Sequence, residues 1–205
     1  MDNRSVPEHR LTLPEVVDWL VADGLAEAEA AEALKKERRL HGGREHPLVV
    51  IADQKWRSTR PVERVLTLEL LTEWLATRSG LDYMHIDPLK IDFTGVADVM
   101  SSAYAGRFGI LPVLVNTREV VIATAEPFVR EWVGELEPIL RKPIRRVIAN
   151  PEDIARYLVE FFNLAKSVKK AAARGEVTSG LSSFEQLVEL GKGNRQFDAN
   201  DQHII

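Results

Sequence analysis

The stretch GILPVLVNTREVVIATAEP, residues 109–127, gives the strongest indication of the fold. Two apolar runs, Ile110–Val115 and Val120–Thr124, flank the polar residues 116–119. Apolar runs rich in β-branched residues and separated by a short polar turn predict a β-hairpin. Pro127 follows the second run, and proline ends a strand and is well suited to the start of a helix. The sequence therefore predicts a hairpin that leads into a helix.

Composition limits the classes of function. The chain has 205 residues, is 45% hydrophobic and 28% charged, and carries a net charge of −4. That balance suits a soluble globular protein and provides no basic field for nucleic acid or an anionic membrane. Cysteine is absent, which excludes disulfides and thiolate metal sites and favours the cytosol. Because no apolar run approaches the roughly 20 residues of a membrane span, we expect any role at a membrane to work through a partner.

The part of the chain before the hairpin has mostly helical patterns. Thr12 and Glu15 have the spacing of a capping box, and apolar residues follow at helical spacing. Residues 26–40 predict a second helix. Residues 48–52 predict a short strand, and residues 53–65 are polar and predict a connection.

A further helix is predicted at residues 68–78, where the chain resembles its own beginning. The segment LTLPEVVDWLVA (11–22) aligns with LTLELLTEWLAT (66–77), 55 residues later. Leu, Thr, Leu, an acid, Trp and Leu stand in register. Two interpretations are open: a pair of similarly capped amphipathic helices, or a duplicated helical unit.

Helices and strands alternate in the second half. Strand-like segments are predicted at 81–91 and 144–149, and helices at 95–108, at 128–136 and from 151 to 173. This alternation favours layers of helices against a sheet. The expected fold class is α+β, with an N-terminal helical subdomain that includes one short strand (1–65), followed by a small α/β subdomain (66–173) whose central sheet contains the hairpin and is packed by helices.

The last part of the chain differs in composition. Residues 174–205 are rich in glycine and polar residues and predict a linker. Ile204 and Ile205 begin a new apolar pattern, so we expect the sequence to stop where another domain starts.

A search for catalytic motifs finds none. Residues 191–194, GKGN, lack the spacing and the hydroxyl of a phosphate-binding loop, and neither HExxH nor GxSxG occurs. The histidines are expected in solvated loops, and His41 with His46 makes a poor metal pair. His85 and Asp87 alternate along a strand-like segment, so they could share a face and a hydrogen bond. We expect no catalytic, cofactor or metal site in this chain.

Four residues are candidates for binding a partner. Trp56 and Arg57 lie in the polar context KWR, where a tryptophan suits an interface anchor. Trp19 is expected in the core or at a contact between subdomains, where it could also contribute to docking. Arg145 and Arg146 are neighbours on a predicted strand, so they point to opposite faces and Arg145 could meet a partner.

Several segments, in order, resemble the N-terminal region of the secretion ATPase E family, the motors of type II secretion and type IV pilus assembly. They are Gly80-Leu81 with Ile86-Asp87-Pro88, Gly109-Ile110-Leu111-Pro112-Val113, Val121-Ile122-Ala123-Thr124-Ala125-Glu126-Pro127, and Arg146-Val147-Ile148-Ala149 with Pro151-Glu152-Asp153-Ile154. The resemblance covers residues 66–165. It implies a docking region that binds the cytoplasmic part of an inner-membrane platform protein. ATP and Mg²⁺ would belong to an ATPase domain further along the chain, and the full-length motor would be a homo-hexamer.

The resemblance also implies an alternative, because some relatives bind cyclic di-GMP through an Arg-Leu-Gly motif followed by a glycine and a helix. Aligning Gly24 with that glycine puts Glu15-Val16-Val17 in place of Arg-Leu-Gly, and an acid repels phosphate. Using Arg10-Leu11 instead breaks the glycine spacing.

Overall fold

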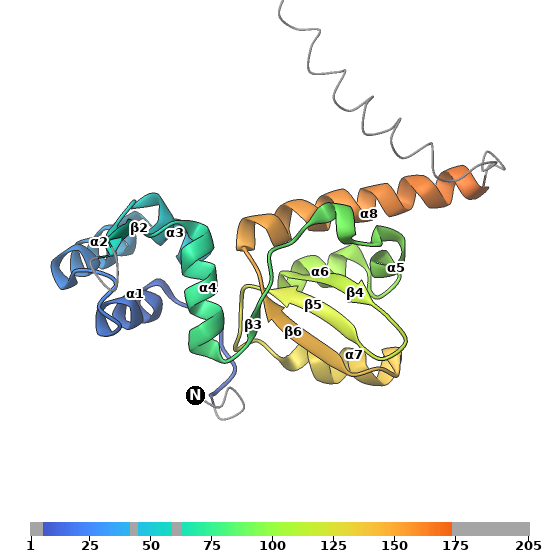
Figure 1. The fold of residues 1–205 in the computed structure, drawn as a ribbon, viewed down its shortest axis with the longest axis horizontal. Coiled ribbons are helices and arrows are strands. Elements are labelled where there is room, and N and C mark those ends of the chain that lie inside the picture. Colours follow the sequence, from blue (N-terminus) through green and yellow to red (C-terminus); the bar gives the residue numbers. More distant parts are fainter. Residues whose placement is uncertain (1–5, 42–44, 59–62, 174–205) are drawn as a thin grey trace, which may run out of the picture. The chain divides into compact units, whose positions relative to one another are not determined.

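A computed structural model describes residues 6–41, 45–58 and 63–173, with side chains at nearly all of these positions (Figure 1). The described residues up to Ala165 belong to one compact unit. A mostly helical first part is followed by a part in which helices pack on a four-stranded sheet with both parallel and antiparallel pairs, which confirms the α+β class. The predicted subdomain boundaries 1–65 and 66–173 stay predictions, and the predicted linker lies outside the described residues.

The first part of the described chain is mostly helical. Its elements are α1 (Leu13–Ala22), α2 (Ala28–His41), α3 (Pro47–Asp53), β1 (Arg57–Ser58), β2 (Arg64–Val65) and α4 (Leu68–Ser79). β1 and β2 pair antiparallel, so the predicted connection contains a small ribbon. The strand predicted at 48–52 is wrong, because these residues form α3. The His46 side chain caps α3 and Pro47 occupies its first turn, which favours the helix over the β-branched composition.

Helices α1 and α4 begin and end alike. Thr12 caps α1 in a capping box with Glu15, as predicted, and Thr67 caps α4. At the other end, Gly24 and Gly80 adopt φ of 70° and 68°, a left-handed conformation that favours glycine. The local structure thus follows the sequence similarity of the two segments.

A four-stranded sheet follows, in the order β3-β6-β5-β4. Its strands are β3 (Asp82–Tyr83), β4 (Ile110–Val115), β5 (Val120–Thr124) and β6 (Ile144–Ile148). β4 and β5 form the predicted antiparallel hairpin, with Val115 opposite Val120, while β5 pairs parallel with β6. The side-chain oxygen of Asn116 accepts hydrogen bonds from two turn N–H groups, of Arg118 and Glu119, which closes the hairpin.

Helices cover both faces of the sheet (Figure 1). These helices are α5 (Phe93–Ala97), α6 (Ser102–Phe108), α7 (Glu131–Leu140) and α8 (Pro151–Ala173), and the short 3₁₀ helix η1 (Pro88–Lys90) precedes them without a buried residue. Alternate hairpin residues pack on opposite sides. Val121 and Ala123 face a cluster with Phe161 of α8, whereas Ile122 faces a cluster with the fully buried Trp132 of α7.

Two predicted helices differ in extent. The single helix predicted at 95–108 is two helices, α5 and α6, because Ser101 caps a new helix with its side chain. The helix predicted at 128–136 begins at Glu131 instead. Phe128 is buried against α1, α3 and α4, in a cluster that also contains Ile148 of β6. The core of the helical part therefore includes residues of the α/β part.

Candidate functional site

Residues 6–11, here called the N-terminal strap, bind the loop 126–130 through alternate loop residues. The N–H of Leu11 donates to Glu126 Oε2 at 2.7 Å. The His9 ring stacks on Phe128, with ring centroids 5.1 Å apart and an interplanar angle of 7°. The Arg130 guanidinium donates to the Val6 carbonyl at 2.7 Å. The strap runs directly into α1, so these contacts anchor the first helix on the α/β part.

Two titratable groups are enclosed beside the strap. Glu126 is only 9% exposed, and burial raises the pKa of its carboxyl. His46 lies within 3.7 Å of it, and burial lowers the pKa of this imidazole to about 4. The His46 Nδ1 accepts from the Leu48 N–H, so Nε2 carries the proton and donates to the Ala125 carbonyl at 3.1 Å. His46 is therefore a neutral structural residue, which corrects the prediction of solvated loop histidines at this position.

A groove of about 290 Å³ opens next to these groups. Its lining combines an apolar floor with a polar end and includes Arg10, His46, Phe108, Glu126, Ile154 and Leu158. Arg10 donates one hydrogen bond to the Arg107 carbonyl, at 2.9 Å, and also borders a second groove of about 280 Å³. The groove is thus lined by both the cation of Arg10 and the carboxylate of Glu126. This mixed lining favours neither an anionic nor a cationic ligand.

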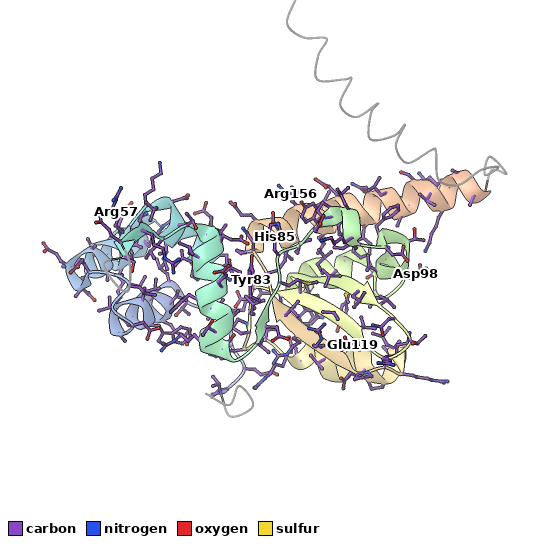
Figure 2. All side chains as sticks on the ribbon, viewed as in Figure 1. Arg57, Tyr83, His85, Asp98, Glu119 and Arg156 are labelled. Atoms are coloured by element: carbon purple, nitrogen blue, oxygen red, sulfur yellow. The ribbon has the colours of Figure 1, made fainter. Side chains whose placement is uncertain are left out.

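The four predicted partner-binding residues differ in their exposure and in their contacts. Trp19 is half-buried and meets Phe128 edge-on, with ring centroids 6.0 Å apart. Trp56 is also half-buried and packs on the helical core. Arg57, labelled in Figure 2, is exposed and pairs with Glu63 at 2.9 Å. No measurement tests their role in docking, so it stays a prediction.

Arg145, the fourth candidate, holds the end of the sheet together. Its guanidinium lies 3.3 Å from the carboxylate of Glu119 and 3.4 Å from that of Asp82 (Glu119 is labelled in Figure 2). Arg146 points the other way, as predicted, and donates to the Pro127 carbonyl at 2.7 Å. Arg145 therefore links β3, β6 and the hairpin turn, and its side chain is only half exposed.

His85 and Asp87 do not meet as the alternation predicts. His85 Nδ1 lies 3.2 Å from Glu69 of α4, whereas Asp87 caps η1 by accepting from the Leu89 N–H at 3.1 Å. His85 is exposed and labelled in Figure 2. This pair offers no catalytic arrangement.

A cluster around Arg78 was not predicted from the sequence. Its guanidinium lies 4.8 Å from the centre of the Trp19 ring and 5.9 Å from that of Trp74, and it binds the Asp23 carboxylate. Trp74 Nε1 donates to the same carboxylate at 2.8 Å. The repeat alignment had placed Trp19 and Trp74 at equivalent positions, which was the signal that could have suggested their meeting.

Two kinds of feature are absent from the described residues. In these parts of the chain, no group of three or more His, Asp or Glu side chains is placed to hold a metal ion. Within the same ranges, no helix is long and apolar enough to cross a membrane.

Comparisons with known proteins agree with the resemblance. Residues 79–168 match the family model described as the MshEN domain. The chain is 38% identical over 161 residues to the type IV pilus assembly ATPase TfpB of Acinetobacter baylyi, an alignment that covers 78% of this chain and 27% of that protein. The chain thus spans about a quarter of the length of the curated relative it matches.

Solved structures were compared as well. A structure of MshE with cdg is 15% identical, with a TM-score of 0.48, covering 74% of this chain and 99% of that one. The N-terminal domain of XpsE is 12% identical, with a TM-score of 0.44, covering 75% and 98%. The match of residues 79–168 to the MshEN family model and the similarity to a pilus assembly ATPase confirm the predicted resemblance to the N-terminal region of the secretion and pilus-assembly ATPases.

Proposed function

We propose that this chain is the docking and regulatory region of a secretion or pilus-assembly motor and binds the cytoplasmic part of an inner-membrane platform protein. The observation that carries the proposal is the MshEN domain at 79–168, together with the similarity to a pilus assembly ATPase over 78% of the chain. The platform protein would bring a cytoplasmic chain to the inner membrane. Assembly of the full-length motor as a homo-hexamer belongs to the same proposal.

Catalysis is assigned to another part of the motor. Phosphate-loop chemistry needs a glycine-rich loop with a lysine and a hydroxyl at fixed spacing, and the sequence of this chain has no such motif. We therefore expect no ATP turnover by this chain alone, and no cofactor of its own.

A titration calorimeter tests the docking proposal. The cytoplasmic domain of the cognate platform protein is titrated into this chain, and we expect a saturable heat signal with a dissociation constant in the micromolar range. A parallel assay follows phosphate release from ATP and should stay at the blank rate. Absence of binding at tens of micromolar would refute docking, and ATP turnover that survives repurification would refute the assignment of catalysis to another domain.

The Trp56–Arg57 corner is the predicted docking contact that can be tested most cleanly. Arg57 and Glu63 are both 66% exposed on the side chain, and a pair this exposed contributes little to stability. Arg57→Glu should therefore leave folding intact, and if this corner docks the platform protein, binding should weaken by about tenfold. The exposed Lys169, changed to Glu, reverses the same charge on α8 and serves as the control.

Cyclic di-GMP is the second candidate ligand, and Arg10 is the observation that favours it. The guanidinium of Arg10 borders two adjacent grooves, where it could stack on a base or meet a phosphate. The alternative alignment, with Glu15-Val16-Val17 in place of the Arg-Leu-Gly motif, is less suitable for binding the nucleotide. Glu15 already binds His9 and the α1 cap, and Val16 and Val17 are fully buried. The carboxylate of Glu126 in the same groove opposes binding of a dianion.

A calorimetric titration with cyclic di-GMP separates the two candidates. Binding through Arg10 predicts a heat signal that Arg10→Ala abolishes, while docking of the platform protein persists. A flat titration at a millimolar nucleotide concentration would remove cyclic di-GMP as a ligand and leave the docking proposal untouched.

A further inference from the structure

The outer face of α4 borders a groove of about 250 Å³, here called the α4 groove. Its apolar walls are formed by leucine side chains from three segments and by the α4 tryptophan: Leu25, Leu66, Leu70 and Trp74. Arg64 and Glu73 stand on its rim. The volume lies below the range of about 300–1,000 Å³ typical of small-molecule pockets, so the groove suits one or two inserted side chains.

The sequence similarity between α1 and α4 allows the groove-lining positions of α4 to be compared with the equivalent positions of α1. Aligning residues 66–77 with residues 11–22 makes Leu70 equivalent to Glu15, Glu73 to Asp18 and Trp74 to Trp19. On α1 these three positions are all engaged by other parts of the chain. His9 binds Glu15 at 2.9 Å, the Lys35 ammonium pairs with Asp18, and the Phe128 ring meets Trp19.

On α4 the equivalent positions lack these partners. Leu70 and Trp74 line the open groove, although the Trp74 indole N–H is held by Asp23. Glu73 is exposed and forms no ion pair with any described residue, and the same holds for Arg64. The face that receives an aromatic ring and an ammonium on α1 is therefore available on α4.

We propose that the α4 groove docks a protein partner through a segment that presents an aromatic side chain beside a basic one. The aromatic ring lies between Leu70 and Trp74, where stacking on an indole and burial of apolar surface stabilise it. The basic group pairs with Glu73, as Lys35 pairs with Asp18 on α1. A tryptophan in an apolar cavity with a charge on its rim has the composition of an interface hot spot.

Two fragment probes test this chemistry without any knowledge of the partner. Phenethylamine carries an aromatic ring and an ammonium, while phenylacetate carries the ring and a carboxylate. The readout is the indole N–H signal of Trp74 in ¹⁵N-resolved NMR spectra, with the buried Trp132 as the internal reference. We expect phenethylamine at millimolar concentration to shift Trp74 alone and phenylacetate to shift it several-fold less.

Variants sharpen that comparison. Glu73→Gln keeps the shape of the rim and should abolish the preference for the ammonium. Glu160→Gln, at an exposed position of α8, removes the same charge elsewhere and should preserve the preference. If both probes leave the Trp74 signal unmoved at about 20 mM, or if Glu73→Gln keeps the preference, the assignment is overturned.

A second experiment asks whether the platform protein uses this groove, and only this step rests on the proposed function. Leu70→Glu should weaken binding of the platform domain by about tenfold and Glu73→Gln by several-fold, with circular dichroism confirming that both variants fold. Platform binding that both variants retain in full would overturn the groove as the site while the docking function stands. If the wild-type chain fails to bind the platform domain, the proposed function falls, whereas the fragment result still decides the groove.

Discussion

Arg78 of α4 donates two hydrogen bonds, at 2.9 and 2.8 Å, to the carboxylate of Asp23, which lies 55 positions earlier in the sequence. Asp23 follows the last residue of α1, and Arg78 lies in the last turn of α4. The side chain of Arg78 is 26% exposed and that of Asp23 is 35% exposed, and the guanidinium also lies against Trp19 and Trp74. This pairing fixes the ends of the two similar helices to each other.

Replacing Arg78 should destabilise the chain more than replacing a fully exposed partner of an ion pair. Arg78→Ala removes two charge-assisted hydrogen bonds and the cation–π contacts, and partial exposure reduces the loss to about 1–2 kcal/mol. Urea unfolding followed by tryptophan fluorescence measures it. Arg57→Ala, which breaks a pair that is 66% exposed on both sides, should cost under about 0.5 kcal/mol. Equal losses for both variants would contradict the structural role of Arg78.

Burial of His46 should make the chain sensitive to acid. Its pKa is about 4 in the folded chain and about 6.5 when unfolded, so the unfolded state binds the proton first. Stability is therefore lost as the pH falls from 6.5 towards 4, by up to about 3 kcal/mol. His46→Asn keeps a side chain that can cap α3 and should flatten this part of the pH profile. If the variant loses as much stability between pH 6.5 and 4 as the wild type, a group other than His46 causes the sensitivity to acid.

Glu126 should produce the opposite trend with pH. Burial raises the pKa of its carboxyl, so the folded state holds the proton more tightly than the unfolded state. Its contribution is present at low pH and is lost as the pH rises through the raised pKa. Glu126→Gln removes this ionisation but keeps an oxygen for the Leu11 N–H, so stability at pH 8 should be equal to or above that of the wild type.

Glu126→Ala serves as the contrasting variant. It removes the acceptor at 2.7 Å from the buried Leu11 N–H, and an unpaired buried donor costs about 1–3 kcal/mol. Thermal unfolding at pH 8 should rank alanine below the wild type and glutamine at or above it. If glutamine fell as far below the wild type as alanine, the charge itself, rather than the hydrogen bond, would anchor the strap.

The two threonine caps should differ in strength. Thr12 and Glu15 form a reciprocal capping box, whereas Thr67 has Leu70 at the matching position and caps α4 alone. Thr67→Ala should cost about 1 kcal/mol, and Thr12→Ala somewhat more. Urea unfolding of both variants measures the difference. A larger loss at Thr67 would mean that the reciprocal bond from Glu15, which His9 also binds, adds nothing to the cap.

Local patterns in the sequence predicted most of the elements. The hairpin at 109–127, the α1 capping box and the long helix α8 are encoded by short-range signals, and all three are present. The failure at 48–52 has a physical reason, since a Val-Val-Ile run suits a buried strand and a buried helix equally well. The helix was signalled by Pro47 after a capping residue, because proline is favoured in the first turn.

The site could not be predicted from local patterns. Leu11 and Glu126 lie 115 positions apart, and nothing in either segment specifies the other. His46 was assigned to a solvated loop because it follows a glycine-rich turn, but the Ala125 carbonyl and the cap of α3 enclose it. Only the repeat carried long-range information, since it placed Trp19 and Trp74 at equivalent positions before the structure brought both to Arg78.

The strap also has a consequence for how the chain is made. Helices α1 to α4 are complete by residue 79, yet their core lacks Phe128 and the strap lacks Glu126 until the loop 126–130 has been synthesised. At about 5–20 residues per second, the first helix waits on the order of ten seconds for its anchor. During translation the part of the helical core that Phe128 covers is thus exposed to chaperones and to wrong partners, and the ribosome sets the time at which this end of the chain can close.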